Sequence, residues 1–419
     1  MSFNETVISE MRALFSPKLP LDKLIDNVSQ ELQQRLEASN VSMLPTCVVN
    51  DLSLNTIVKS LEGSGTYLLA IDLGGTTLKM GILSIPQFQM VYHQSLDLPH
   101  KVVNLKFFRE IASWVCEKTH EFILLKGLSG RLTFLTGITF SFPLNSRNEI
   151  TTMGKGFTIA EEVTSVSIQE VLEQSFEQVL VKFDFKIQFY GVINDSVAVY
   201  LANKASTEED GISLILGTGI NSCFSLPSLE VPSNKKLLEY SQNDVLLINS
   251  EIGFLGEKYI PLTQFDPPNS SKDNIPFMPL EYVTSGNWIP LALGNVLTYY
   301  GIMPQTPLKL NGQLICQILE DETVNIFQDH QDLVRELTAM MIERGVTYLC
   351  AALKGISRFK KNDRQIIQVG YVGSFLRHCK LYQKRVEQIS KGSIQLRFLE
   401  HSNLIGAAID TLQHVATSS

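Results

Sequence analysis

The sequence predicts an α/β protein with two related domains. Two stretches carry this prediction, because each reads as a strand, a glycine-rich turn and a second strand. They are LAIDLGGTTLKMGIL at residues 69–83 and ISLILGTGINSCF at residues 212–224. A length of 419 residues with 44% hydrophobic content provides enough apolar material for two or three domains. Two similar turns, far apart in one chain, suggest two related domains that face one cleft.

Composition narrows the class of protein. The net charge of −8 argues against nucleic acid as a partner, because binding to phosphate backbones needs clustered Lys and Arg. No apolar run approaches about 18 residues, so no membrane span is expected. The N-terminus lacks a basic region followed by an apolar run, and the six scattered cysteines form no CxxC pair. We therefore expect a cytoplasmic protein with reduced thiols, and its oligomeric state stays open.

The remaining elements follow from the spacing of apolar residues. Residues 20–39 place apolar side chains on one helical face, which predicts an amphipathic helix that packs on the protein or binds a partner. Residues 84–99 are expected to continue the first sheet, residues 106–125 to form a helix and residues 131–142 a strand. The predicted boundaries are 1–60 for an N-terminal helical segment, 61–206 for the first domain and 207–419 for the second.

The first glycine-rich turn is a candidate phosphate site. Gly74 and Gly75 let the backbone approach a ligand, and successive N–H groups there can cradle a phosphate. Asp72, at the end of the preceding strand, is a natural partner for a phosphate-bound Mg²⁺ through water. The alternative is a plain hairpin with an Asp cap, because the common phosphate-loop spacings are absent.

Four polar positions elsewhere follow strands or lie in glycine-rich loops. Ser141 ends an apolar strand, and Lys155 lies between two glycines; each alone is typical of an ordinary loop. Asp195 lies where a strand ends and a helix begins, so it is either a helix N-cap or a general base for phosphoryl transfer. Glu251 follows another strand, two residues after Asn249, where a carboxylate can bind a pair of sugar hydroxyls.

Seven motifs, in their order along the chain, resemble the hexokinase family of eukaryotes. They are IDLGGTTLK, TFSFPLN, GKGF, VINDS, LGTGIN, INSEIG and LEYVTSG, and they cover nearly the whole sequence. The stretches NSEIGFLG and GYVGSFL are similar to a divergent hexokinase-like branch of budding yeasts. The resemblance implies the actin-like ATPase (ribonuclease H-like) fold, with two lobes of mixed sheets around a deep cleft. It also implies transfer of the γ-phosphoryl group of ATP to the 6-hydroxyl of glucose or a related hexose.

The resemblance further implies a role for each matching residue. Asp195 matches the catalytic base. The positions that match sugar contacts are Ser141, Lys155, Asn194, Asn221, Glu251 and Glu281. The positions that match the sites of ATP and its phosphates are Asp72, Gly74, Gly75, Thr76, Thr77, Lys79, Gly217, Thr218, Gly219, Gly373 and Ser374. Asp72 is the residue expected to hold Mg²⁺ through water.

Positions in the sugar site and in the first phosphate loop depart from the family pattern. Gly154 replaces a Thr that touches the sugar, and Thr77 replaces an Asn in the first phosphate loop. Before Glu281, two amides are replaced by Phe277 and Met278. These two changes predict a more apolar pocket wall, with weaker pairing to sugar hydroxyls.

The nucleotide loops depart as well. Val372 replaces an Asp near the adenosine, and a glycine-rich C-terminal loop is replaced by HSNL at residues 401–404. Flexible glycines are lost where the backbone approaches a nucleotide, which lowers the expected affinity for ATP. Two classes of function therefore stay open: an active ATP-dependent sugar kinase, and a hexokinase-like sugar sensor or regulator with little or no turnover.

Overall fold

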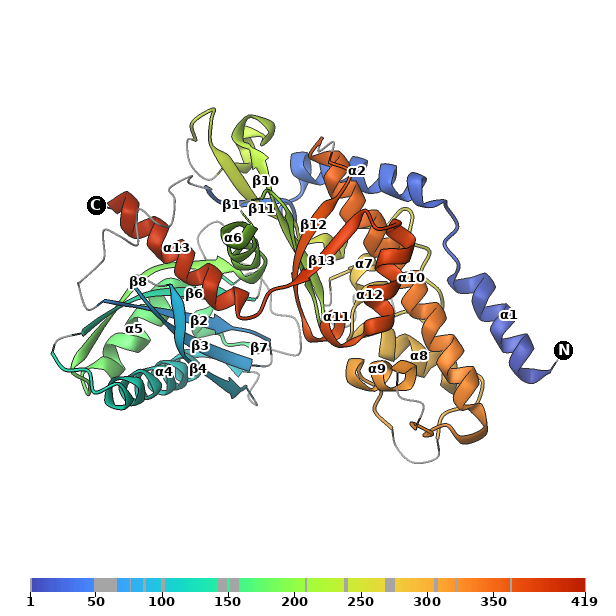
Figure 1. The fold of residues 1–419 in the computed structure, drawn as a ribbon, viewed down its shortest axis with the longest axis horizontal. Coiled ribbons are helices and arrows are strands. Elements are labelled where there is room, and N and C mark those ends of the chain that lie inside the picture. The colour runs from blue at the N-terminus through green and yellow to red at the C-terminus, as the bar shows by residue number, and fades with distance from the viewer. Residues whose placement is uncertain are drawn as a thin grey trace. The chain divides into compact units, whose positions relative to one another are not determined.

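The computed structural model separates into two compact units (Figure 1). It describes residues 2–48, 66–75, 77–85, 88–98, 102–130, 132–141, 149–150, 158–207, 209–236, 240–267, 276–304, 308–320, 323–361 and 364–418. Unit 1 comprises Met1–Pro45, Asp210–Lys236 and Leu247–Glu400, and unit 2 comprises Thr46–Glu209, Leu237–Leu246 and His401–Ser419. The units are interleaved along the chain, and the consecutive boundaries at residues 60 and 206 stay a prediction.

Unit 2 contains a five-stranded mixed sheet in the order β4-β3-β2-β6-β8. Its strands are β2 (Tyr67–Leu73), β3 (Thr77–Ser84), β4 (Gln89–Asp97), β6 (Leu132–Phe140) and β8 (Phe185–Asn194). The glycine turn makes β2 and β3 antiparallel, whereas β6 and β8 run parallel to β2 because helices α4 (Leu105–Leu125) and α5 (Ile168–Leu180) carry the chain back. The predicted hairpin, its continuation through residues 84–99, the helix at 106–125 and the strand at 131–142 are confirmed.

Helices cover both faces of this sheet. Alternate residues of β2 point to opposite sides, so that Leu69 and Ile71 pack against α4 and α5, while Leu68 and Ala70 pack against α13 (Ser402–Ser418). In Figure 1, α13 lies along the sheet beside α6 (Asp195–Thr207). The last helix in the chain therefore completes the core of unit 2.

A close helix contact fixes α13 against α6. A Cβ added at Gly406 of α13 would lie only 2.0 Å from the carbonyl oxygen of Ala198 in α6. A Cβ added at Gly137 of β6 would likewise lie 2.4 Å from the carbonyl oxygen of Ala407. Glycine at both positions allows the helix to approach the sheet and α6 more closely than a side chain would permit.

The second sheet has six strands in the order β1-β11-β10-β9-β12-β13. They are β1 (Leu44–Val48), β9 (Ile212–Leu216), β10 (Ile220–Pro227), β11 (Val245–Asn249), β12 (Ile367–Val372) and β13 (Ile394–Phe398). β9 and β10 form the second predicted hairpin, and β12 and β13 run parallel to β9. The series β10-β9-β12-β13 thus repeats the order and directions of β3-β2-β6-β8 in unit 2. This repeat confirms the prediction of two related α/β domains.

The N-terminal helices belong to unit 1. Helix α2 (Leu21–Ala38) buries Leu24, Ile25, Val28, Leu32 and Leu36, and it packs on the long helix α10 (Gln331–Phe359). A Cβ at Gly355 of α10 would lie 2.3 Å from a methyl group of Val28. The amphipathic helix predicted at residues 20–39 is therefore confirmed, and its apolar face packs on the body of the protein.

The other elements are short or peripheral. They are α1 (Phe3–Phe15), β5 (Val102–Val103), β7 (Thr158–Ile159), α7 (Pro279–Thr284), α8 (Trp288–Tyr299), α9 (Gly312–Glu320), α11 (Ser374–His378) and α12 (Lys380–Ser390). Among the described residues, no helix combines the length and apolarity needed to cross a membrane. The cysteines whose side chains are described are buried thiols rather than disulfides: Cys116, Cys223, Cys316, Cys350 and Cys379.

Candidate functional site

A buried cluster of two amides and a carboxylate lies where β10 and β11 are neighbours. Asn221 belongs to β10, Asn249 ends β11, and Glu251 follows two residues later. Oε1 of Glu251 accepts hydrogen bonds from Nδ2 of Asn249 at 2.9 Å and Nδ2 of Asn221 at 3.1 Å. The exposed fractions of the three residues are 9%, 4% and 8% in sequence order, so water competes little for these groups.

The backbone of Glu251 adopts an unusual conformation in this cluster. Its φ is +49° and its ψ is +51°, in the left-handed region that non-glycine residues rarely occupy. The N–H of Glu251 donates to Oδ1 of Asn221 at 3.0 Å. Asn221 therefore fixes both the backbone and the carboxylate of Glu251, which offsets the conformational strain.

A second carboxylate, Glu281 of α7, lies beside this cluster. Its Oε2 accepts a hydrogen bond from the backbone N–H of Ile220 at 3.1 Å, and its Oε1 accepts one from Nε1 of Trp288 at 3.0 Å. Ile220 directly precedes Asn221 on β10. A Cβ placed on Gly253 would lie 3.4 Å from Cβ of Glu281, which brings the turn after Glu251 against α7. Unit 1 thus brings Asn221, Glu251 and Glu281 together.

The two positions before α7 point in different directions. Cε of Met278 would lie 2.6 Å from a Cβ on Gly253, so this side chain covers the turn that follows Glu251. The ring of Phe277 instead packs edge-on against Tyr282, with 6.1 Å between ring centroids, and Tyr282 packs against Trp288 at 5.2 Å. Burial raises the pKa of Tyr282, whose hydroxyl donates to the carbonyl of Pro276. Of these two side chains, Met278 is therefore the one that lies against the turn after Glu251.

The second glycine-rich turn lies next to Glu281. The N–H of Gly217 donates to the carbonyl of Gly219 at 3.0 Å, and a Cβ on Gly219 would lie 2.6 Å from Oε2 of Glu281. Gly373 has φ +116°, and a Cβ there would lie 2.2 Å from the carbonyl oxygen of Leu216. This close approach requires glycine, and it places Ser374 beside the turn. The predicted residues Gly217, Thr218, Gly219, Gly373 and Ser374 thus form one group in unit 1.

In unit 2 the predicted residues that the structure describes lie near the carboxyl ends of the parallel strands. Leu73, Phe140 and Asn194 are opposite one another at the carboxyl ends of the parallel strands β2, β6 and β8. The N–H of Ser141 donates to the carbonyl of Leu73 at 3.2 Å. The loops that follow these strands therefore start side by side, which is where α/β proteins commonly bind ligands.

Asp72 is buried near these strand ends, with an exposed fraction of 2%. Its Oδ1 accepts hydrogen bonds from the Thr139 hydroxyl at 2.7 Å and from Nδ2 of Asn403 at 3.1 Å. The ammonium group of Lys79 lies 3.4 Å from Oδ2. The sequence did not indicate the contacts of Thr139 and Asn403, and the only signal for Asn403 is that it lies in the segment that departs from the family's glycine-rich loop.

The surroundings of Asp72 suit a water-mediated Mg²⁺ ion. The buried Oδ1 of Asn403 has no hydrogen-bond partner among the described residues, and metal-bound water is a donor that would satisfy it. Mg²⁺ usually keeps several waters and takes one or two carboxylates together with substrate phosphates. Among the described residues, no group of three or more His, Cys, Asp or Glu side chains is placed to hold a metal. Asp72 and Asn403 thus offer oxygen atoms that could accept hydrogen bonds from the waters of a phosphate-bound ion.

The start of α6 contains the two predicted residues Asn194 and Asp195. Oδ1 of Asn194 accepts from both the N–H and the hydroxyl of Ser196, at 2.9 and 2.7 Å. Asp195 is the first residue of the helix and is half-buried.

The β2–β3 turn and β3 contain four further predicted residues: Gly74, Gly75, Thr77 and Lys79. The N–H of Gly74 donates to the carbonyl of Thr77 at 3.1 Å. Two predicted site residues, Thr76 and Lys155, lie outside the described residues.

Two solved structures of hexokinases resemble the fold of this chain. The hexokinase from Schistosoma mansoni complexed with glucose matches 98% of this chain and 100% of its own, with a TM-score of 0.77 at 19% identity. A crystal structure of another hexokinase matches 98% of the chain with a TM-score of 0.69 at 18% identity. These likenesses confirm the actin-like ATPase fold, with two lobes and mixed sheets.

Sequence comparison then identifies the family. Two family models, both described as hexokinase, match residues 10–205 and 211–413, so the chain belongs to the hexokinase family of sugar kinases. N-acetylglucosamine kinase 1 of Candida albicans is 24% identical over 99% of this chain and 92% of its own length. Hexokinase-2 of Solanum tuberosum is 27% identical over 89% of this chain and 82% of its own. The resemblance drawn from the seven motifs is confirmed.

Proposed function

We propose that this protein is an ATP-dependent kinase that phosphorylates the 6-hydroxyl of glucose or a related hexose. The observation that carries the proposal is the buried cluster of Asn221, Asn249 and Glu251, with Glu281 beside it. Sugars present adjacent hydroxyls, and fixed carboxylates and amides bind such pairs without reorganising. In this proposal Asn221, Glu251 and Glu281 of unit 1 bind sugar hydroxyls, as do Ser141, Lys155 and Asn194 of the chain's first half.

In this proposal Asp195 is the general base. Its carboxylate takes the proton of the 6-hydroxyl as that oxygen forms a bond to the γ-phosphorus, and the bond from phosphorus to the bridging oxygen breaks to release ADP. The N–H groups of the two glycine turns and the Lys79 ammonium group stabilise the charge on the phosphates. Mg²⁺, when bound with the nucleotide, neutralises charge on its phosphate oxygens. Asp72 would hold that ion through water.

We further propose that the preferred hexose carries a substituent with an apolar methyl end, with N-acetylglucosamine as the first candidate. The methyl end of Met278 covers the turn after Glu251, where the family has an amide. An acetamido group presents a methyl to such a surface, whereas a bare hydroxyl there would lose a hydrogen-bond partner. The relative in Candida albicans that spans 99% of this chain is named N-acetylglucosamine kinase 1, which supports including this sugar.

The alternative is a hexokinase-like sugar sensor or regulator with little or no turnover. The observation that favours it is the beginning of α13, where Asn403 bonds to Asp72 in a segment that lacks the family's glycines. A side chain in that place restricts the approach of a nucleotide to the backbone. For either function we propose the cytoplasm as the compartment, because the described cysteines are buried thiols.

A substrate panel tests the proposal. Purified protein is assayed for ADP release with ATP, Mg²⁺ and glucose, mannose, fructose or N-acetylglucosamine, and each sugar is also titrated by calorimetry. Saturable ADP release that depends on one hexose supports the kinase. Sugar binding with no release above the rate without sugar supports the sensor. If no sugar binds and none is phosphorylated, both proposals are wrong.

A further inference from the structure

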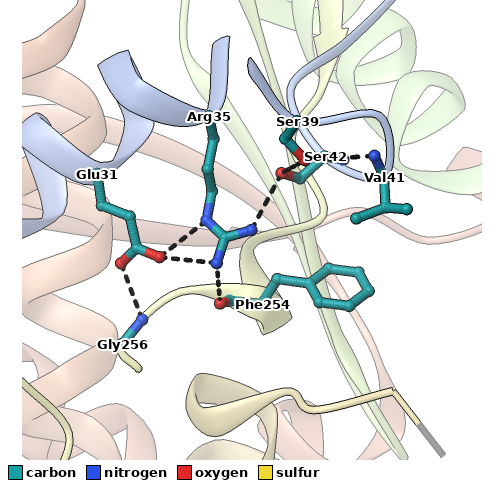
Figure 2. A network of polar contacts seen from close by, with 7 residues as sticks. All are labelled: Glu31, Arg35, Ser39, Val41, Ser42, Phe254 and Gly256. Atoms are coloured by element: carbon teal, nitrogen blue, oxygen red, sulfur yellow. Dashed lines mark hydrogen bonds and ion pairs between the residues drawn. The ribbon is translucent and has the colours of Figure 1, made fainter. Parts of the chain in front are cut away.

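We infer that Arg35 and Glu31 of helix α2 are positioning residues that hold Glu251 in its sugar-binding conformation. This inference rests on the proposed function, in which Glu251 binds sugar hydroxyls. Neither residue belongs to a motif of the family resemblance, and both lie in the N-terminal helix (Figure 2). The inference extends the site to an element that the motifs do not include.

The pair binds the turn that follows Glu251. Nη2 of Arg35 donates to the carbonyl of Phe254 at 2.6 Å, and Oε2 of Glu31 accepts the N–H of Gly256 at 2.9 Å (Figure 2). The two side chains also bond to each other, because Nε and Nη2 of Arg35 both lie 2.8 Å from Oε1 of Glu31. The planar guanidinium thus bridges the carboxylate and the turn with a fixed geometry.

The residues after α2 hold the other end of the same turn. The N–H of Met43 donates to the carbonyl of Ser250 at 3.2 Å, directly before Glu251. Nη1 of Arg35 lies 3.4 Å from the hydroxyl of Ser42, so the same guanidinium reaches this segment. The ammonium group of Lys235 donates to the carbonyls of Ser42 and Met43 at 2.9 and 3.1 Å. Residues 250–256 are therefore bound to the N-terminal segment on both sides of Glu251.

These contacts matter because the backbone of Glu251 is strained. A non-glycine residue in the left-handed region persists only where its surroundings determine its conformation. The short 3-10 helix η4 (Ile252–Phe254) follows, and the N–H of Phe254 donates to the carbonyl of Glu251 at 3.2 Å. Arg35 binds the carbonyl of that same Phe254, so Phe254 is hydrogen-bonded both to the guanidinium and to the strained residue.

The Arg35–Glu31 pair is shielded from solvent, which strengthens its hydrogen bonds. The side chains of Arg35 and Glu31 are 19% and 17% exposed, so solvent screens them less than it screens a surface ion pair. By contrast, Asp26 of the same helix pairs with Arg358 of α10 near the surface, with side chains 40% and 49% exposed. The Asp26 pair joins α2 to the body of unit 1 without touching the turn, which makes it a matched control.

The test compares Arg35→Lys and Glu31→Gln with the control Asp26→Ala. Arg35→Lys keeps the positive charge but loses the planar guanidinium with its several N–H donors. Glu31→Gln keeps the shape of the side chain but loses its negative charge. Hydrogen exchange in sugar-free protein measures how well the backbone amides of Glu251, Phe254 and Gly256 are protected. Steady-state kinetics measure KM for the sugar and for ATP. We expect exchange at these amides and KM for the sugar to rise by about tenfold in both variants, with KM for ATP unchanged.

The control separates positioning from general stabilisation of α2. Asp26→Ala removes another ion pair of α2, and it should leave both the turn and the sugar KM unchanged. Equal effects in all three variants would overturn the inference, and so would faster exchange with an unchanged sugar KM. Hydrogen exchange needs no ligand, so an unchanged exchange rate overturns the inference even if the wild type neither binds nor phosphorylates a sugar.

Discussion

Asn194 caps helix α6 by accepting two hydrogen bonds from Ser196, one from its N–H and one from its hydroxyl. An Asn oxygen bound to an N–H in the first turn is a favourable helix start. The beginning of α6 therefore has a cap that does not depend on the side chain of Asp195, the next residue. This relationship makes the role of Asp195 testable without loss of the helix.

Replacing Asp195 by Ala should abolish most phosphorylation and leave the fold intact. General base catalysis contributes roughly 10²–10⁴-fold in rate, so kcat should fall by about that factor. Sugar affinity should weaken only moderately, because the Asn221–Glu251 cluster and Glu281 remain. The measurement is ADP release with the best hexose, together with calorimetric binding of that hexose.

The opposite result would identify Asp195 as a structural residue. A helix cap typically contributes about 1 kcal/mol to stability, so a capping role predicts a loss of that size with activity kept. Asp195→Asn is the control, because it preserves size and one acceptor oxygen but cannot accept the proton. If the Asn variant retains full activity, Asp195 is not the base.

Restoring amides at Phe277 and Met278 should improve glucose binding. A buried hydroxyl that lacks a partner costs on the order of 1–3 kcal/mol, so the Gln variants should bind glucose more tightly by calorimetry. Because Met278 covers the turn after Glu251 and Phe277 packs on Tyr282, Met278→Gln should account for most of the change. Equal glucose affinity in wild type and the double variant would show that these side chains do not contact the sugar.

Local sequence patterns predicted the hairpins and helices well, because each of these elements is formed by residues that are close together in the sequence. The hairpins at 69–83 and 212–224 each combine apolar alternation with a glycine turn, and the helix at 20–39 has one apolar face. The contacts that build the site are of another kind. Asn403 bonds to Asp72 across 331 residues and Arg35 to Phe254 across 219, and no periodicity reports such pairs.

The motifs indicated which residues to expect in the candidate site, and the geometry added what surrounds them. Glu251 and Glu281 were expected from the resemblance, whereas the bond from Trp288 to Glu281 depends on how α7 and α8 pack. The same holds for Met278 and Phe277, which are adjacent in sequence and point to different neighbours. Side-chain direction follows from tertiary packing, so it is not contained in the motif.

Gly406→Ala should destabilise the protein although Ala is normally the better helix former. The new Cβ would lie 2.0 Å from the carbonyl oxygen of Ala198, and backbone atoms cannot move aside cheaply. We expect a loss of roughly 1–3 kcal/mol in denaturant unfolding. The control is Gly294→Ala in α8, where the nearest atom to a new Cβ is a Leu310 methyl group at 3.6 Å.

The free energy of unfolding should therefore decrease in Gly406→Ala and increase in Gly294→Ala. At Gly294 the change should stabilise by up to about 1 kcal/mol, as the intrinsic helix preference requires. Equal stabilisation at both positions would show that α13 does not approach α6 as closely as described.

Asp410 of α13 should make stability depend on pH. Burial raises its pKa to about 6, although the nearby His414 acts in the other direction. The folded state then keeps a proton that the unfolded chain releases near its ordinary pKa of about 3.9. The stabilisation from this group is present below about pH 4 and is lost as the pH rises through about 6.

Asp410→Asn removes this dependence, since the amide stays neutral. Its stability relative to wild type should increase between pH 4 and 7 by on the order of 1–3 kcal/mol in urea unfolding. Asp332→Asn in α10 is the control, because that side chain is 97% exposed. A constant difference between Asp410→Asn and wild type at all pH values would contradict the buried, protonated Asp410.

The interleaving of the two units constrains how the chain is made. A ribosome delivers the strands of unit 2 early, but Leu68, Ala70 and Leu83 lose contact with water only when α13 is attached to them. Unit 1 has the reverse requirement, because α2 must wait for α10, more than 290 residues later. Neither unit can complete its core during vectorial synthesis until residues from both ends have emerged. Apolar strand surface of the nascent chain therefore stays uncovered until α13 has been made, and such surface makes an incomplete chain prone to aggregation.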